Sequence, residues 1–158
     1  IQTKNLSNKS TNKISKIKYN KVLKSLLRGC KLLEKNKYKK NTKIGLLATE
    51  GTLKTGVYNK FFDIKYKLVY PNVKIQKDNV NKAIKYVKMG NIRAAEKSIK
   101  PAIDFLIKSK CKKIILGCTE LPIAIFAFKS FNKVKSSKIF LDPNLILANS
   151  AMKKYKTK

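Results

Sequence analysis

The residue with the clearest chemical potential in this sequence is Cys118. It follows the apolar, strand-like run at residues 113–116 and precedes an apolar stretch of helical character. In open α/β sheets, ligands bind at the carboxyl ends of strands, and the start of a helix favours a thiolate there. The pattern predicts a thiol with a lowered pKa, able to act as a nucleophile or as a proton-abstracting base. Spacing alone leaves a second interpretation open, because a free cysteine beside a strand is more often part of the core.

The other reactive residue types restrict the alternatives. The sequence contains three cysteines, without a C-x-x-C spacing, and no histidine. A His/Cys zinc site and Ser-His-Asp or Cys-His catalytic groups therefore lack their components. We expect no metal and no cofactor. Scattered cysteines in odd number fit a reducing compartment better than a disulfide scaffold, so we expect a cytoplasmic protein.

The elements that must position Cys118 alternate between strands and helices. Strands are expected at residues 43–48, 113–116 and 138–141. Helices are expected at 21–33 and at 78–88, the latter with Gly90 as its C-terminal cap. A longer helix should begin at about 91, another should run from the Cys118 turn to about 128, and a last one should begin at 144. Pro101 should kink the helix that begins near residue 91, or end it. This alternation predicts an α/β fold with a parallel sheet.

The string IILGCTELP at residues 114–122 resembles a signature of the cofactor-independent aspartate/glutamate racemase family. Four further segments are similar to segments of that family and occur in the same order: KIGLLATEGT at 43–52, TGVY at 55–58, YVKMGN at 86–91 and IFLDPNLILA at 139–148. The resemblance covers roughly residues 21 to 152.

Family members have two similar α/β lobes, and each lobe supplies one cysteine to the cleft between them. The resemblance implies one complete parallel-sheet racemase lobe of about four strands with flanking helices, plus a remnant helix of the other lobe. The expected organisation is a basic disordered tail at 1–20, a remnant first-lobe helix and linker at 21–40, and the racemase-like lobe at 43–158. The first-lobe cysteine, which the family carries in a CNT-type motif, has no counterpart here. The segment that contains it looks deleted between residues 35 and 42.

The resemblance also assigns site residues. Cys118 would exchange a proton at the substrate α-carbon, and Thr119 with the N–H groups of its helix would hold the α-carboxylate. Thr49 and Thr52 are candidates for further carboxylate contacts, with loop capping as the alternative. Lys88 aligns with a family lysine near the substrate, with an exposed lysine at a helix end as the alternative.

Glu120 is part of the signature, although its spacing alone indicates a first-turn acid that complements the helix dipole. The expected function is an amino-acid racemase acting on aspartate or glutamate, truncated so that one of the two cysteines is missing. The alternative is a non-catalytic homologue that retains only amino-acid binding or self-association. A homo-oligomer is expected in either case.

The charge of the chain is its compositional anomaly, with 38 basic against 8 acidic residues and a formal net charge of +30. Such a charge is typical of nucleic-acid-binding proteins. However, only Arg28 and Arg93 are arginines, and the lysines are scattered through every segment among many asparagines. An AT-rich genome explains this pattern better, so we expect no specific nucleic-acid partner. The basic, acid-poor residues 1–20 would also suit an organelle transit peptide. No apolar run approaches the length of about 20 residues that spans a bilayer, so no membrane partner is expected.

Overall fold

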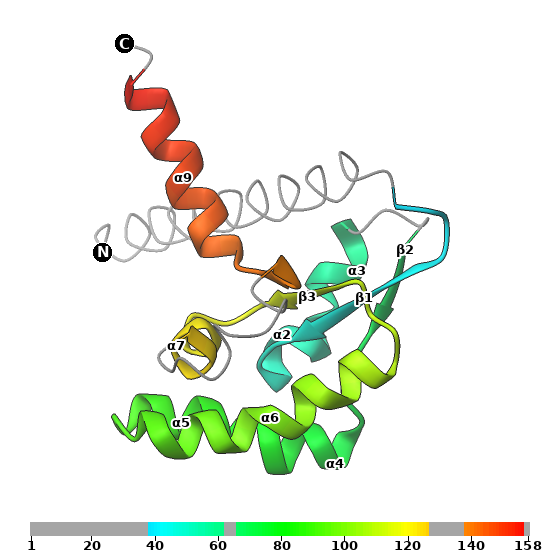
Figure 1. The fold of residues 1–158 in the computed structure, drawn as a ribbon, viewed down its shortest axis with the longest axis vertical. Coiled ribbons are helices and arrows are strands. Elements are labelled where there is room, and N and C mark those ends of the chain that lie inside the picture. Colours follow the sequence, from blue (N-terminus) through cyan, green and yellow to red (C-terminus); the bar gives the residue numbers. More distant parts are fainter. Residues whose placement is uncertain (1–37, 62–65, 127–137, 157–158) are drawn as a thin grey trace, which may run out of the picture.

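The computed structural model of the chain describes residues 38–61, 66–126 and 138–156. Within these ranges, four strands form one parallel sheet in the order β2-β1-β3-β4 (Figure 1). The strands are β1 (Thr42–Leu47), β2 (Tyr66–Val69), β3 (Lys113–Leu116) and β4 (Phe140–Leu141). This arrangement confirms the α/β fold with a parallel sheet that the sequence predicts.

Helices fill the connections between the strands. Those between β1 and β2 are α2 (Glu50–Thr55) and α3 (Val57–Phe61). The long crossover from β2 to β3 contains α4 (Val73–Ile75), the π-helix η1 (Gln76–Asn81), α5 (Lys82–Lys88) and α6 (Ile92–Lys108). The helix α7 (Glu120–Phe126) follows β3, and α9 (Pro143–Lys156) follows β4.

Alternating side chains of the strands build a separate core on each face of the sheet. Leu47, Ile114 and Leu116 pack with the buried residues of α5, α6 and α7. Ile44 and Ile115 point the other way and pack with residues of α2 and α3. In Figure 1, α5 and α6 run side by side along one face of the sheet. Because helices cover both faces, a ligand is expected at the carboxyl edge of the strands.

The strand order creates a topological switch point. The chain leaves β1 to form β2 on one side, and then returns past β1 to form β3 on the other side. At such a point the loops after the two central strands diverge, and ligands bind in the crevice between them. The loop after β1 carries Thr49, and the loop after β3 carries Cys118.

Several element boundaries differ from the expected ones, while β3 has its expected bounds. The strand β2 is not predicted by the sequence. It has only four residues, with Lys67 among apolar ones, and so short a segment carries little periodic signal. The expected helix at 78–88 begins earlier, with η1 and α5 in continuous sequence. The strand β4 holds only two of the four expected residues.

Pro101 does not end α6, which runs through it as one element. Its missing N–H would have bonded to the carbonyl of Lys97. Both residues are exposed, so water can satisfy that carbonyl. Gly90 follows α5 with φ 74°, as predicted for its C-terminal cap. Asn91, which was not predicted as a cap, is the N-cap of α6 and accepts a hydrogen bond from the Ala94 N–H.

Some expectations lie outside the described residues. These are the tail at 1–20, the helix at 21–33 with Cys30, and all of the 21–40 segment except residues 38–40. Among the described residues, no helix is both long and apolar enough to cross a bilayer.

Candidate functional site

Cys118 lies in the short loop between β3 and α7, as its sequence position predicts. The loop is tied to the neighbouring strand, because the Gly117 N–H donates to the carbonyl of Leu47 over 2.7 Å. The Cys118 side chain is half-buried. The thiol therefore lies at the carboxyl edge of the sheet, on the switch point between β1 and β3.

The carboxylate of Glu120 is the centre of this site. The Cys118 thiol donates to Glu120 Oε2 over 2.6 Å, and the Thr119 hydroxyl donates to the same oxygen over 3.0 Å. The ammonium group of Lys88, at the end of α5, lies 3.7 Å from Glu120 Oε1. The fold thus brings three of the expected site residues onto one carboxylate, including Lys88 from 32 positions before Glu120 in the chain.

The electrostatics of the thiol differ from the sequence expectation. Burial and the neighbouring Glu120 carboxylate, which accepts the S–H and repels a thiolate, raise the pKa of Cys118 to about 11. Lys88 acts in the opposite direction but more weakly. The expectation of a lowered pKa is therefore wrong, because burial of the thiol and a carboxylate in hydrogen-bond contact outweigh the start of a short helix. The same S–H bond lowers the pKa of Glu120.

Thr49 and Thr52 lie in the loop after β1 and in the first turn of α2. Thr49 is the N-cap of α2, and its Oγ1 accepts from the Thr52 N–H over 3.2 Å. The two hydroxyl oxygens are 3.0 Å apart and share a hydrogen bond. These contacts are those of the capping interpretation. A contact of either hydroxyl with a ligand carboxylate remains a prediction.

The absence of a side chain at Gly117 allows the two loops to approach. A Cβ atom there would lie 3.0 Å from the Tyr58 hydroxyl oxygen and 3.1 Å from the Ala48 Cβ. Ala48 directly precedes Thr49, so the loops after β1 and β3 are packed closely together here. The tight packing explains why glycine precedes the cysteine in this loop.

Cys111 is not part of the site. It lies before β3, at the end of the strand opposite Cys118, and is buried. Burial raises the pKa of its thiol. In the described part of the chain no group of three or more His, Cys, Asp or Glu side chains could hold a metal ion.

Sequence reasoning underestimated Glu120 and missed the residues around Gln76. Glu120 was interpreted as a helix-dipole residue, although the two-residue spacing from Cys118 was a usable signal. Gln76 is buried, and its amide donates to the carbonyl of Ala48 and to Asn81. No pattern in the sequence indicates that contact, because it joins residues 28 positions apart.

Comparisons with known proteins agree with the geometry. The solved structure of Picrophilus torridus aspartate racemase superposes with a TM-score of 0.64 at 25% sequence identity, covering 82% of this chain and 51% of that chain. An uncharacterized protein in the pnlA 3' region of Pectobacterium carotovorum subsp. carotovorum is 34% identical over 89 residues, which are 56% of this chain and 59% of that protein. The chain thus spans between about half and three-fifths of the length of these two relatives.

The model of the Asp/Glu/hydantoin racemase family matches residues 28–151, which include every element from β1 to β4 and most of α9. The resemblance seen in the sequence motifs is thereby confirmed. The protein belongs to the Asp/Glu/hydantoin racemase family.

Proposed function

We propose that this chain provides the Cys118 half of a cofactor-independent amino-acid racemase site that takes aspartate or glutamate. The observation that carries the proposal is the convergence of Cys118, Thr119 and Lys88 on the Glu120 carboxylate at the switch point of the sheet. A thiol, hydroxyl donors and a cation within reach of each other are the groups that proton transfer at the α-carbon of an acidic amino acid requires.

Each group has a distinct task. The hydroxyls of Thr119, Thr49 and Thr52 donate hydrogen bonds to the α-carboxylate. The Lys88 ammonium, which is 64% exposed, attracts the side-chain carboxylate of the substrate. The sulfur of Cys118 exchanges a proton with the α-carbon. As a thiolate it takes the proton when the Cα–H bond breaks, and as a thiol it returns a proton to the resulting carbanion.

The raised pKa decides in which form the resting site is found. With a pKa of about 11, Cys118 is a thiol at neutral pH and is ready to donate its proton. Proton abstraction requires the thiolate, so the rate of that half-reaction rises with pH up to the pKa. Burial and Glu120 together raise this pKa, so the thiolate forms only at a higher pH than for a free cysteine.

Inversion of the substrate needs a second proton-transfer group on the opposite face of the α-carbon. Among the described residues, Cys118 is the cysteine at this edge of the sheet. A positioned proton donor contributes about 10²–10⁴-fold in rate. We therefore expect the chain by itself to exchange the α-proton of one enantiomer with solvent, and to invert it at least about a hundredfold more slowly than a two-base racemase.

The test is proton NMR of L-aspartate and D-aspartate, each with the purified chain in D₂O, at pD 8 and pD 10. Loss of the α-proton signal for one enantiomer, faster at the higher pD and abolished by Cys118→Ala, is the expected result. No exchange with either enantiomer at either pD would contradict proton transfer by Cys118. Rapid interconversion of the enantiomers would show that another residue of this chain is the second base.

A second function, amino-acid binding without catalysis, is favoured by one observation. Among the described residues, Cys118 is the one cysteine at this edge of the sheet, and its pKa of about 11 leaves almost no thiolate at physiological pH. In this case aspartate shifts the NMR signals of residues near Cys118 and Lys88 in a saturable way, while its α-proton stays in place at both pD values. The two functions therefore separate in the same samples.

A further inference from the structure

A series of hydrogen bonds joins the π-helix η1 to the loop after β1. The Gln76 Nε2 donates to the carbonyl of Ala48 over 3.0 Å and to Asn81 Oδ1 over 2.9 Å. The Asn81 Nδ2 in turn donates to Glu50 Oε1 over 2.5 Å. We call these three side chains, Gln76, Asn81 and Glu50, the amide relay.

The direction of every bond in the amide relay follows from one charge. The Glu50 carboxylate only accepts hydrogen bonds, so Asn81 must turn its NH₂ group toward it. The Asn81 carbonyl oxygen then faces Gln76 and requires a donor. Gln76 therefore uses both hydrogens of its NH₂ group, one for Asn81 and one for Ala48.

This arrangement leaves the Gln76 carbonyl oxygen unsatisfied. Gln76 is 5% exposed, and its Oε1 has no hydrogen-bond partner in the described part of the chain. A buried acceptor without a donor lowers stability, and native proteins keep few of them. Gln76 also begins a π-helix, a rare conformation that occurs often at functional sites. Two unfavourable local features at one residue indicate that its bonds are retained for something other than stability.

The amide relay brackets Thr49. It holds the backbone of Ala48 before Thr49 and the side chain of Glu50 after it. Thr49 in turn holds the Thr52 N–H through its Oγ1 and the Leu53 N–H through its carbonyl. One residue before Ala48, the carbonyl of Leu47 binds the N–H of Gly117, next to Cys118. The relay thus acts on the loop that directly follows β1, the strand to which Gly117 is bonded.

We propose that Gln76, Asn81 and Glu50 are positioning residues, which hold the β1–α2 loop so that the Thr49 and Thr52 hydroxyls can bind the substrate carboxylate. The ligand named here rests on the proposed function, whereas the positioning of the loop does not.

The experiment breaks the hydrogen bond between Asn81 and Glu50 and then remakes it with the donor and acceptor exchanged. Asn81→Asp keeps the shape of the side chain but sets a carboxylate against that of Glu50, which breaks the bond. Adding Glu50→Gln supplies a donor at position 50 and remakes the bond with opposite polarity. Glu50→Ala, at an exposed position, opens the relay without a new charge. Asn79→Asp, on the same π-helix, is the matched control for the charge change.

Two readouts are measured on each variant. Amide hydrogen exchange of Thr52 and Leu53 reports the loop, with the Ile114 N–H, which bonds to the carbonyl of Ile139, as the remote reference. NMR titration with aspartate reports the affinity of the site. Asn81→Asp should speed exchange at Thr52 and Leu53, and raise the Kd for aspartate, each by at least about threefold. Glu50→Ala should do so to a smaller extent, the double variant should restore both, and Asn79→Asp should change neither.

Three outcomes would overturn the proposal: unchanged exchange at Thr52 and Leu53 in Asn81→Asp, an equal acceleration at Ile114, or a loosened loop with unchanged affinity for aspartate. If the wild-type chain binds neither aspartate nor glutamate, but the loop loosens and the double variant restores it, the positioning stands and the proposed function fails.

Discussion

At the scale of single residues, Glu120 determines the chemistry of the site. Its carboxylate accepts hydrogen bonds from Cys118 and Thr119 and pairs with Lys88. The ion pair with Lys88 contributes little to stability, because the Lys88 ammonium is mostly exposed and screened by water. The S–H bond matters more for the thiol, because it adds to burial in raising the pKa of Cys118. Burial and Glu120 therefore together set the pH above which the thiolate of Cys118 forms.

Glu120→Gln should lower the pKa of Cys118 and speed its alkylation. In the wild type the pKa of about 11 leaves roughly one thiol in a thousand ionised at pH 8, and the rate with iodoacetamide should rise about tenfold per pH unit until the pKa is reached. Glutamine removes the negative charge that raises the pKa. The variant should therefore react several-fold faster at pH 8 and reach its plateau at a lower pH.

Mass spectrometry of the labelled peptides measures these rates for each cysteine separately. Cys111 serves as the internal control, because it is buried at the far end of β3 and should be labelled equally slowly in both proteins. An identical pH profile for Cys118 in the wild type and in Glu120→Gln would show that the carboxylate does not control the thiol.

At the scale of the elements, the site depends on how closely the loops after β1 and β3 approach. The two strands are paired directly, and their alternating side chains belong to two cores on opposite faces. Gly117 is the position at which this packing leaves no room, since a Cβ would meet Tyr58, Ala48 and Leu46 at 3.0–3.1 Å. The glycine therefore serves the fold and the position of Cys118 together.

Gly117→Ala should destabilise the protein by about 1–3 kcal/mol, the usual range for overpacking a dense interior. It should also displace the Cys118 loop, which would alter the NMR signals of that loop. Gly51→Ala is the matched control, because the nearest atom to its Cβ is 3.9 Å away and alanine is a better helix former by about 1 kcal/mol. Urea denaturation of both variants measures the difference, and equal stability would contradict the close approach of the two loops.

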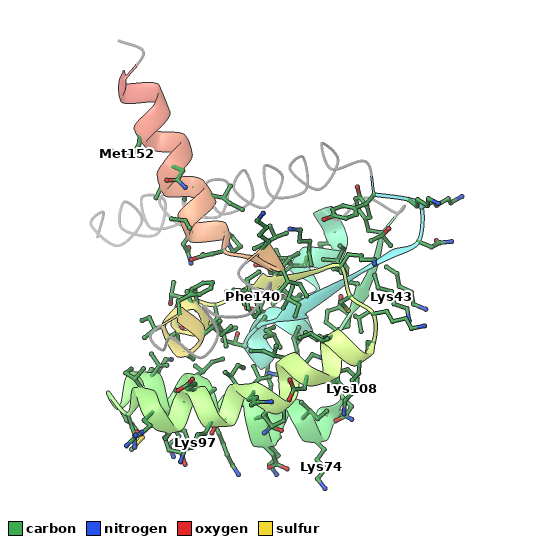
Figure 2. The ribbon with its side chains drawn as sticks, viewed as in Figure 1. Lys43, Lys74, Lys97, Lys108, Phe140 and Met152 are labelled. Atoms are coloured by element: carbon green, nitrogen blue, oxygen red, sulfur yellow. The ribbon has the colours of Figure 1, made fainter. Side chains whose placement is uncertain are left out.

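At the scale of the whole molecule, the net charge opposes self-association and the exposed apolar side chains favour it. Figure 2 shows Lys74, Lys97 and Lys108 projecting from the helices, and all three are exposed. The net charge of +30 makes copies of the chain repel each other. The helix α9 extends away from the sheet in Figure 1, and its Leu145 and Met152 are 57% and 60% exposed. Exposed apolar side chains of this kind favour association.

We therefore expect self-association that strengthens as salt screens the repulsion. Sedimentation velocity at 50 mM and 500 mM salt should show a larger associated fraction at the higher concentration. Leu145→Lys with Met152→Lys should reduce that fraction, while Val73→Lys, an exposed apolar position on α4, is the control. A monomer at both salt concentrations would remove the expectation of a homo-oligomer.

The sequence by itself determined the family, the parallel α/β fold and the location of Cys118. These depend on local signals, namely the period of apolar residues, the caps at Thr49 and Gly90, and a nine-residue string around the cysteine. The strand β3 was predicted to the residue because a short apolar run is bounded on both sides. The strand β2 was missed because it is buried through its pairing with β1, and the sequence of its own four residues gives no sign of that pairing.

The tertiary structure alone decided the pKa of the Cys118 thiol and the residues that surround it. The position of Cys118 before a helix predicted a lowered pKa, but the rotamers of Cys118 and Glu120 place a carboxylate 2.6 Å from the sulfur. Lys88 and the Gln76 amide reach the switch point from a crossover whose path depends on the packing of α5 and α6. Local chemistry can be inferred from neighbouring residues in the sequence, whereas a pKa depends on every charge within a few ångströms, and those charges are brought together only by folding.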